Sequence, residues 1–141
     1  MRKVILSEKF EKFAEHWSPK IVGEVNDAYV KLVKLQGEFV WHHHEAEDEL
    51  FFVLQGVMWM KYREPLREEA AEHPERREGV APRYEEKEER VGPGEFIVIP
   101  RGLEHCPVAD EEVHLMLLEP KTTLNTGNVQ NERTVPVLER L

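Results

Sequence analysis

The residues with the clearest capacity for metal chemistry lie in the stretch 37–56, which reads GEFVWHHHEAEDELFFVLQG. It contains three consecutive histidines, His42, His43 and His44. Successive side chains of a β-strand point to opposite faces, so His42 and His44 would share one face and His43 would point away from them. Two imidazoles directed at one point are typical ligands of a first-row transition metal.

A carboxylate is the expected third ligand of this site. Glu49 is preferred over Glu45, Glu47 and Asp48 because it stands at the start of the next apolar run, residues 50–54, where a strand would hold it in place. Carboxylate and imidazole together suit the harder first-row ions. The stretch itself offers no fourth ligand that strand alternation would place on the same face.

Several short strands must position these side chains. Alternating or continuous apolar runs bounded by Gly, Pro, Asn and Asp predict strands at residues 27–35, 50–54, 57–62, 95–100 and 113–120. Both faces of the runs LFFVL and FIVI are apolar, so we expect one face inside a barrel and the other covered by a second sheet or another subunit. Many short strands with Gly/Pro turns favour an all-β sandwich or barrel.

Two further segments surround the predicted strands. Residues 7–17 place apolar side chains at roughly helical spacing behind Ser7, which predicts a short N-terminal helix. Residues 63–90 carry ten acidic and seven basic side chains, and we expect a charged, solvated insertion at the end of a hairpin, or a lid over the site. A short helix over 65–72 is predicted within it.

Size and charge limit the functions that the chain can have. With 141 residues and 40% hydrophobic residues, we expect a single domain over 1–141. The net charge of −9 repels polyanions, so neither a nucleic-acid nor a membrane partner is expected. The only cysteine, Cys106, cannot form an intramolecular disulfide. No signal-peptide or membrane-spanning run is recognised, and we expect a cytoplasmic location.

Two motifs resemble those of the cupin superfamily. The first is HHHEAEDELFFVLQG, read as His42, one residue, His44, four residues, Glu49, six residues and Gly56; the second is GEFIVIPRGLEH, which ends at His105. The resemblance covers about residues 30–119. Ala109 stands where the family pattern usually has an asparagine.

The resemblance implies a double-stranded β-helix, or jelly-roll barrel, with its core at about 27–119. It also implies that His42, His44, Glu49 and His105 bind one divalent transition metal, which could be Fe, Mn, Ni, Cu or Zn. Such a site serves dioxygenases, isomerases and lyases of the family. The alternative is a non-catalytic cupin that binds a small molecule for sensing and holds a structural metal.

Alternation from Glu49 also predicts a ligand pocket. The expected inward-facing and mouth residues are Phe51, Val53, Met58, Met60, Phe96, Val98 and Arg101. They would form a mostly apolar pocket for a small molecule with one metal-chelating end. By the same alternation, Cys106 should point away from the metal. Apolar outer faces and an apolar C-terminus predict a homodimer.

Overall fold

An antiparallel β-sheet makes up most of the fold in residues 1–66 and 83–141, the part of the chain that the computed structural model describes. The elements, in chain order, are α1 (Leu6–Phe10), β1 (Lys20–Val25), β2 (Ala28–Glu38), β3 (Glu49–Gln55), β4 (Met58–Pro65), β5 (Tyr84–Val91), β6 (Phe96–Ile99) and β7 (Glu104–Pro120). The prediction of an all-β fold with a short N-terminal helix is confirmed.

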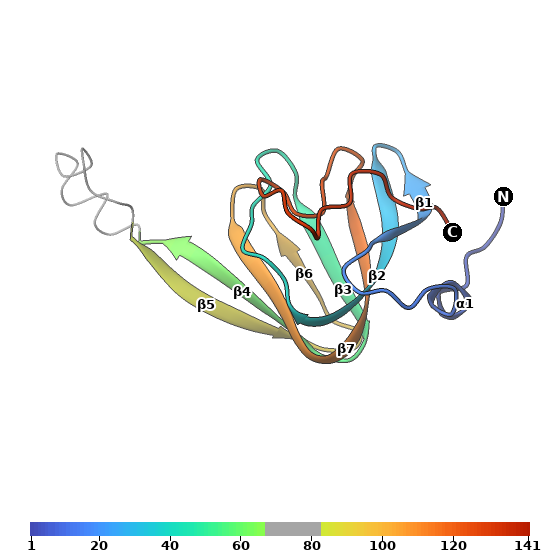
Figure 1. Cartoon of the computed structure of the whole chain (residues 1–141), viewed down its shortest axis with the longest axis horizontal. Helices are drawn as coiled ribbons and strands as arrows, with labels where there is room; N and C mark the ends of the chain where they lie inside the picture. Colours follow the sequence, from blue (N-terminus) through green and yellow to red (C-terminus); the bar gives the residue numbers. More distant parts are fainter. Residues whose placement is uncertain (67–82) are drawn as a thin grey trace.

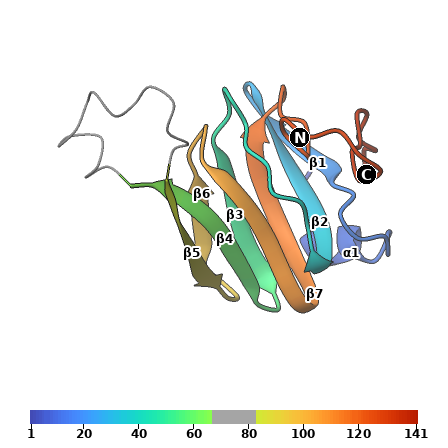
Figure 2. The same cartoon turned by 60° about the vertical axis from the view of Figure 1, so that its left-hand side comes forward.

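The long strand β7 organises the sheet. Its second half pairs with β2 on one side and β3 on the other, while its first half pairs with β4. Beyond these, β1 extends the sheet past β2, β6 pairs with β3, and β5 pairs with β4. The sheet curves strongly, so that β4 and β5 turn away from β1 and β2 (Figures 1 and 2). The architecture is that of a jelly roll.

The concave face of the sheet holds the main hydrophobic core. Alternate residues of β2, β3, β4 and β7 point inward and are buried there: Val33, Leu35, Phe51, Val53, Met58, Met60, Val113, Leu115 and Leu117. A smaller cluster lies on the outer face, where Phe10 and Phe13 cover Leu32. The N-terminal segment is therefore a packing element of the sheet, and its apolar spacing reflects that contact.

The predicted helix over 7–17 is correct only at its start. Helix α1 begins one residue earlier, with Ile5 as N-cap in place of Ser7, and ends at Phe10. Beyond it, the backbone N–H of Trp17 donates to the carbonyl oxygen of Lys34 at 2.9 Å, and His16 forms a bridge to β2. Pairing with the sheet satisfies this backbone better than another helical turn, which would stay exposed.

The charged insertion predicted over 63–90 is partly wrong. β4 continues to Pro65, and Tyr84–Val91 pairs with it as β5, so a two-stranded ribbon extends from the sheet (Figure 1). The side chains of β5 are exposed up to Val91, as the composition indicated. Backbone pairing and cross-strand ion pairs such as Lys87 with Glu64, at 2.8 Å, hold a strand without a core. The predicted helix over 65–72 lies almost wholly outside the described residues.

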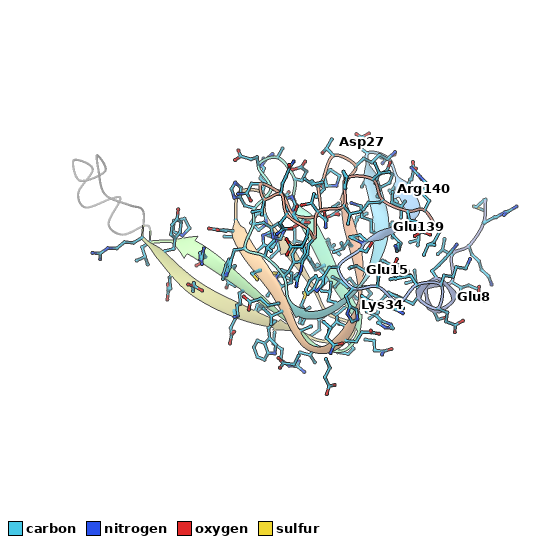
Figure 3. All side chains as sticks on the ribbon, in the orientation of Figure 1. Glu8, Glu15, Asp27, Lys34, Glu139 and Arg140 are labelled. Atoms are coloured by element: carbon cyan, nitrogen blue, oxygen red, sulfur yellow. The ribbon has the colours of Figure 1, made fainter. Side chains whose placement is uncertain are left out.

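The C-terminus lies along the outer edge of β1, a strand that the sequence did not predict. The backbone of Ile21 accepts from Leu141 and donates to Glu139, both at 2.9 Å. Lys20, which is 3% exposed, binds the carboxylates of Glu15 and Glu139, which Figure 3 shows close together. No helix among the described residues is long and apolar enough to cross a membrane.

Candidate metal centre

The two histidine segments of the candidate site are joined by backbone hydrogen bonds. The His42 N–H donates to the His105 carbonyl oxygen at 3.0 Å, and the His105 N–H donates to that of His42 at 2.9 Å. Residues 42–44 are therefore extended by pairing with β7, although they belong to no strand of their own. The carbonyl oxygens of His43 and His44 accept from the backbone N–H groups of Asn128 and Gly102.

This extended conformation gives the alternation that the sequence predicted. His42 and His44 are 2% and 4% exposed and point inward with the fully buried His105. His43 points away, with its Nε2 at 3.2 Å from Glu45. The fourth residue of the cluster is Glu49, at the first position of β3, with 4% of its surface exposed.

The potential ligand atoms of these four residues converge. One nitrogen or oxygen atom from each of His42, His44, Glu49 and His105 lies within 4.8 Å of the other three. The Oε2 atom of Glu49 lies 3.0 Å from His44 Nε2 and 3.1 Å from His105 Nε2. Three imidazole nitrogens and one carboxylate oxygen are a donor set for a divalent first-row metal.

Hydrogen bonds on the other side of the rings fix which nitrogens face the cluster. The Nδ1 atoms of His42 and His105 donate to the carbonyl oxygens of Val40 and Leu103, at 2.9 and 2.8 Å. A carbonyl oxygen only accepts, so Nδ1 carries a proton in both rings and the Nε2 atoms are the ones that face the centre. Backbone carbonyls on the outer nitrogen are the usual support of metal-binding histidines.

The electrostatics of the cluster call for a cation. Burial, followed by the neighbouring His105, lowers the pKa of His42 to about 4, so this imidazole is neutral near pH 7. Burial acts to raise the pKa of Glu49, but the imidazoles of His105 and His44 outweigh it and hold the carboxylate ionised. The Nε2 atom of His44 has no hydrogen-bond partner despite its proximity to Glu49. Imidazole nitrogens and an ionised carboxylate that face one buried position fit a bound metal ion.

A cavity borders the cluster on the concave face of the sheet. It is narrow, with a volume of about 40 Å³, and both His42 and Glu49 line it. The rest of its wall is mostly apolar, with Trp17, Phe39 and Phe51 as aromatic members. A ligand in the cavity would therefore contact the candidate metal position directly.

Comparison with known proteins identifies the family. No protein-family model matches the sequence. The chain is 36% identical to a cupin-2 domain-containing protein from Shewanella frigidimarina NCIMB 400, with a TM-score of 0.66. That match covers 84% of this chain and 94% of the other. The chain belongs to the cupin superfamily.

Further similarities of this cupin are more distant or shorter. KdgF from Halomonas sp. is 25% identical with a TM-score of 0.50, over 73% of this chain and 79% of the other. Hydroquinone 1,2-dioxygenase from Sphingomonas sp. TTNP3, solved with 4-hydroxybenzoate bound, shares the fold at 15% identity and a TM-score of 0.59, over 78% and 69%. Uncharacterized protein YdbB of Bacillus subtilis (strain 168) is 44% identical over 43 residues, and the match spans only 38% of its length.

The predicted pocket residues of the cupin lie in three different environments. Phe51 lines the cavity. Val53, Met58 and Met60 point to the same face but are fully buried in the core, away from the cavity wall. Arg101 is exposed at the turn before β7, where its backbone N–H donates to Asp48 Oδ1 at 2.8 Å.

The prediction that Phe96 and Val98 face inward is wrong. They are 62% and 48% exposed on the outer face of β6. The β3–β6 register pairs Glu49 with Ile99, which puts Ile97 and Ile99 on the inner face. Where every residue of a strand is apolar, composition does not reveal which alternate set of side chains points inward. The pairing with the neighbouring strand decides it.

Cys106 follows His105 but serves the fold. It is fully buried on the side of β7 away from the cluster, at 3.8 Å from Glu38 Oε1. Burial raises the pKa of its thiol to about 11, so the reactive thiolate is scarce near pH 7.

Sequence reasoning missed two charged residues beside the site, Lys31 and Glu119. Both are buried on the inner face, where Glu119 lines the cavity next to the metal cluster. Glu119 continues the inward series Val113, Leu115 and Leu117 on β7, and Lys31 precedes Val33 and Leu35 on β2. Each of the two interrupts a series of inward-facing apolar residues with a charge, and this pattern could have indicated them from the sequence.

Proposed function

We propose that this cupin is a mononuclear metalloenzyme that acts on a small, largely apolar molecule. The observation that carries the proposal is that His42 and Glu49 line a mostly apolar cavity, so one side of the four-residue cluster faces it. The opposite sides of the imidazoles are occupied by backbone carbonyls, so access is from the cavity.

The metal would be a divalent transition ion, and Fe, Mn, Ni, Cu and Zn all suit the donor set. When bound, such an ion polarises a chelating oxygen of a substrate or, if redox-active, binds dioxygen. The chain's own part is to hold the imidazoles at fixed orientation, to keep Glu49 ionised and to exclude water with an apolar wall. These roles fit an oxygenase, an isomerase or a lyase.

Metal reconstitution followed by turnover assays tests the proposal. The protein, stripped with a chelator, would be loaded in turn with each of the five ions and offered a panel of small oxygen-bearing substrates under air and under argon. We expect one ion to restore turnover in the wild type and in His43→Ala, but not in His44→Ala. Oxygen consumption would identify an oxygenase, and turnover under argon an isomerase or a lyase.

The competing function is a sensing cupin whose metal supports the fold. Tight binding of a metabolite, without turnover by any reconstituted form, would establish that function and overturn the enzymatic one.

We also propose that the protein works as a homodimer in the cytoplasm. The outer face of β6 presents the exposed Phe96 and Val98, and the half-buried Leu50, Phe52 and Leu118 of β3 and β7 continue this apolar surface. It lies at the sheet edge that β6 leaves unpaired. A two-fold contact between copies would bury this uncharged patch against itself and keep the acidic surfaces apart in a chain of net charge −9. The single cysteine, Cys106, fits a reducing compartment.

A further inference from the structure

A buried ion pair lies beside the candidate metal centre. Lys31 Nζ donates to Glu119 Oε1 at 2.6 Å, and each side chain is only 2% exposed. Lys31 comes from β2 and Glu119 from β7, which pair with each other. On the other side of β7, the pairing of Leu50 with Leu118 brings Glu49 and Glu119 next to each other on adjacent strands.

One oxygen atom of this pair has no hydrogen-bond partner. Glu119 Oε2 is fully buried and unbonded, and Glu119 is part of the cavity wall. A buried, unbonded carboxyl oxygen costs free energy unless a ligand completes it.

The other polar side chains of the cavity wall already have partners or belong to the metal cluster. The Asn125 amide donates to the carbonyl oxygen of Arg133 and accepts from the backbone N–H of Val135. His42 and Glu49 face the candidate metal position. Among the described residues of the wall, Glu119 therefore provides a buried oxygen atom to which no N–H or O–H group donates.

A purely structural role does not explain the pair. Two apolar side chains of similar volume would fill the same space without the desolvation cost of two charges, and such replacements are often neutral or stabilising. The position of the pair at the cavity, instead of deep in the core, points to a ligand.

The surrounding charges limit which chemical group of a ligand can bind Glu119. A carboxylate or phosphate would be repelled by Glu119 and Glu49, and a protonated amine by Lys31 and by the cation of the metal site. A neutral hydroxyl group avoids both penalties and can donate to Oε2. The aromatic side chains of Trp17, Phe39 and Phe51 provide contacts for an apolar ring or chain.

We propose that Glu119 Oε2 binds a hydroxyl group of the ligand, so that the cavity selects small, uncharged, apolar molecules that carry a hydroxyl. The inference rests on the proposed function in one respect: it takes this ligand to be the substrate of the metal centre. The selectivity itself belongs to the cavity and does not require the metal.

Calorimetric titration with phenol and toluene tests the proposal, because the two molecules differ in a hydroxyl against a methyl group. Both would be titrated into chelator-stripped protein and into protein loaded with Zn(II). We expect the wild type to bind phenol about tenfold more tightly than toluene in both forms, as one buried hydrogen bond implies. Glu119→Gln, which keeps a hydrogen-bonding group and a partner for Lys31, should retain the preference.

The decisive variant is the double substitution Lys31→Met with Glu119→Leu, because Glu119→Leu alone would leave Lys31 buried without a partner and could unfold the chain. In the double variant the preference should reverse in favour of toluene, the more apolar molecule. The inference is overturned if the wild type prefers toluene or binds neither molecule, or if the double variant still prefers phenol. Failure of the enzymatic proposal can be distinguished from failure of this inference. In that case no metal-loaded form would turn over a substrate, while the chelator-stripped protein would still bind phenol more tightly than toluene.

Discussion

His42 and His105 exchange a pair of backbone hydrogen bonds, and their imidazole rings lie 4.3 Å apart. The bridge holds the segment before β3 against the first half of β7, so two ligands that are distant in the sequence are fixed relative to each other without any metal. Such preorganisation reduces the conformational entropy that metal binding must overcome.

Removing one inward imidazole should abolish stoichiometric metal binding. We expect the wild type to bind about one ion per chain and His44→Ala to lose it on purification, because the substitution removes one of the four candidate donors and lowers the affinity. His43→Ala is the matched control, since His43 points away from the cluster, and it should retain the metal. Elemental analysis of both purified variants measures the difference. Equal metal content in the two would contradict the assignment.

The stability of the metal-free protein should fall in mild acid. Burial and then the neighbouring His105 lower the pKa of His42 from 6.5 to about 4. The unfolded chain therefore binds a proton at this residue between these pH values while the folded chain does not. The stabilisation is complete above pH 6.5 and decreases by up to about 3 kcal/mol as the pH approaches 4.

Urea unfolding of chelator-stripped wild type and His42→Gln at several pH values between 7 and 4 measures this effect. The difference in unfolding free energy between the two proteins should shrink toward acid. A difference that stays constant with pH would show that His42 does not carry the dependence.

Replacing only one member of the buried pair of Lys31 and Glu119 should lower the unfolding free energy more than replacing both. Lys31→Met leaves the Glu119 carboxyl buried without its 2.6 Å partner, and we expect a loss of about 3 kcal/mol in unfolding free energy. The double variant with Glu119→Leu should recover most of that loss. Chemical denaturation of the wild type and both variants provides the comparison, and a double variant less stable than Lys31→Met would indicate a structural role.

The C-terminal segment should be required for the geometry of the metal centre. A Cβ atom at Gly127 would clash with the carbonyl oxygen of His43, which lies between two ligands of the cluster. We expect Gly127→Ala to lower both unfolding free energy and metal affinity. Gly94→Ala is the control, because Gly94 also has a positive φ, 80° against 56° at Gly127, but no neighbouring atom within 4 Å of its Cβ position, so the substitution should cost only about 1 kcal/mol.

A charge on the outer face of β6 should separate the proposed dimer. Light scattering is expected to give twice the 16.6 kDa mass of the chain for the wild type and the monomer mass for Phe96→Glu. Val25→Glu places the same charge on an exposed valine of β1, at the opposite edge of the sheet, and should leave the dimer intact. A monomeric wild type would refute the dimer without affecting the metal centre.

Local sequence patterns predicted the donor set because the relevant signals were themselves local. Alternation over His42, His43 and His44 holds for any extended backbone, so it was correct even though these residues pair with β7 as a bridge and form no strand of their own. The two cupin motifs added His105, and the short apolar runs between turns predicted the all-β fold.

Other features depended on pairing between distant segments and only the tertiary structure decided them. The inner face of β6 follows from its register with β3, since a run of four apolar residues offers two equivalent parities. The strand β5 is stabilised by its pairing with β4 and has no hydrophobic pattern of its own. Lys31 and Glu119 come together because β2 and β7 are neighbours, and their place beside Glu49 requires β3 on the other side of β7. The sequence by itself therefore determined which residues can bind a metal, whereas the arrangement of the strands determined what surrounds it.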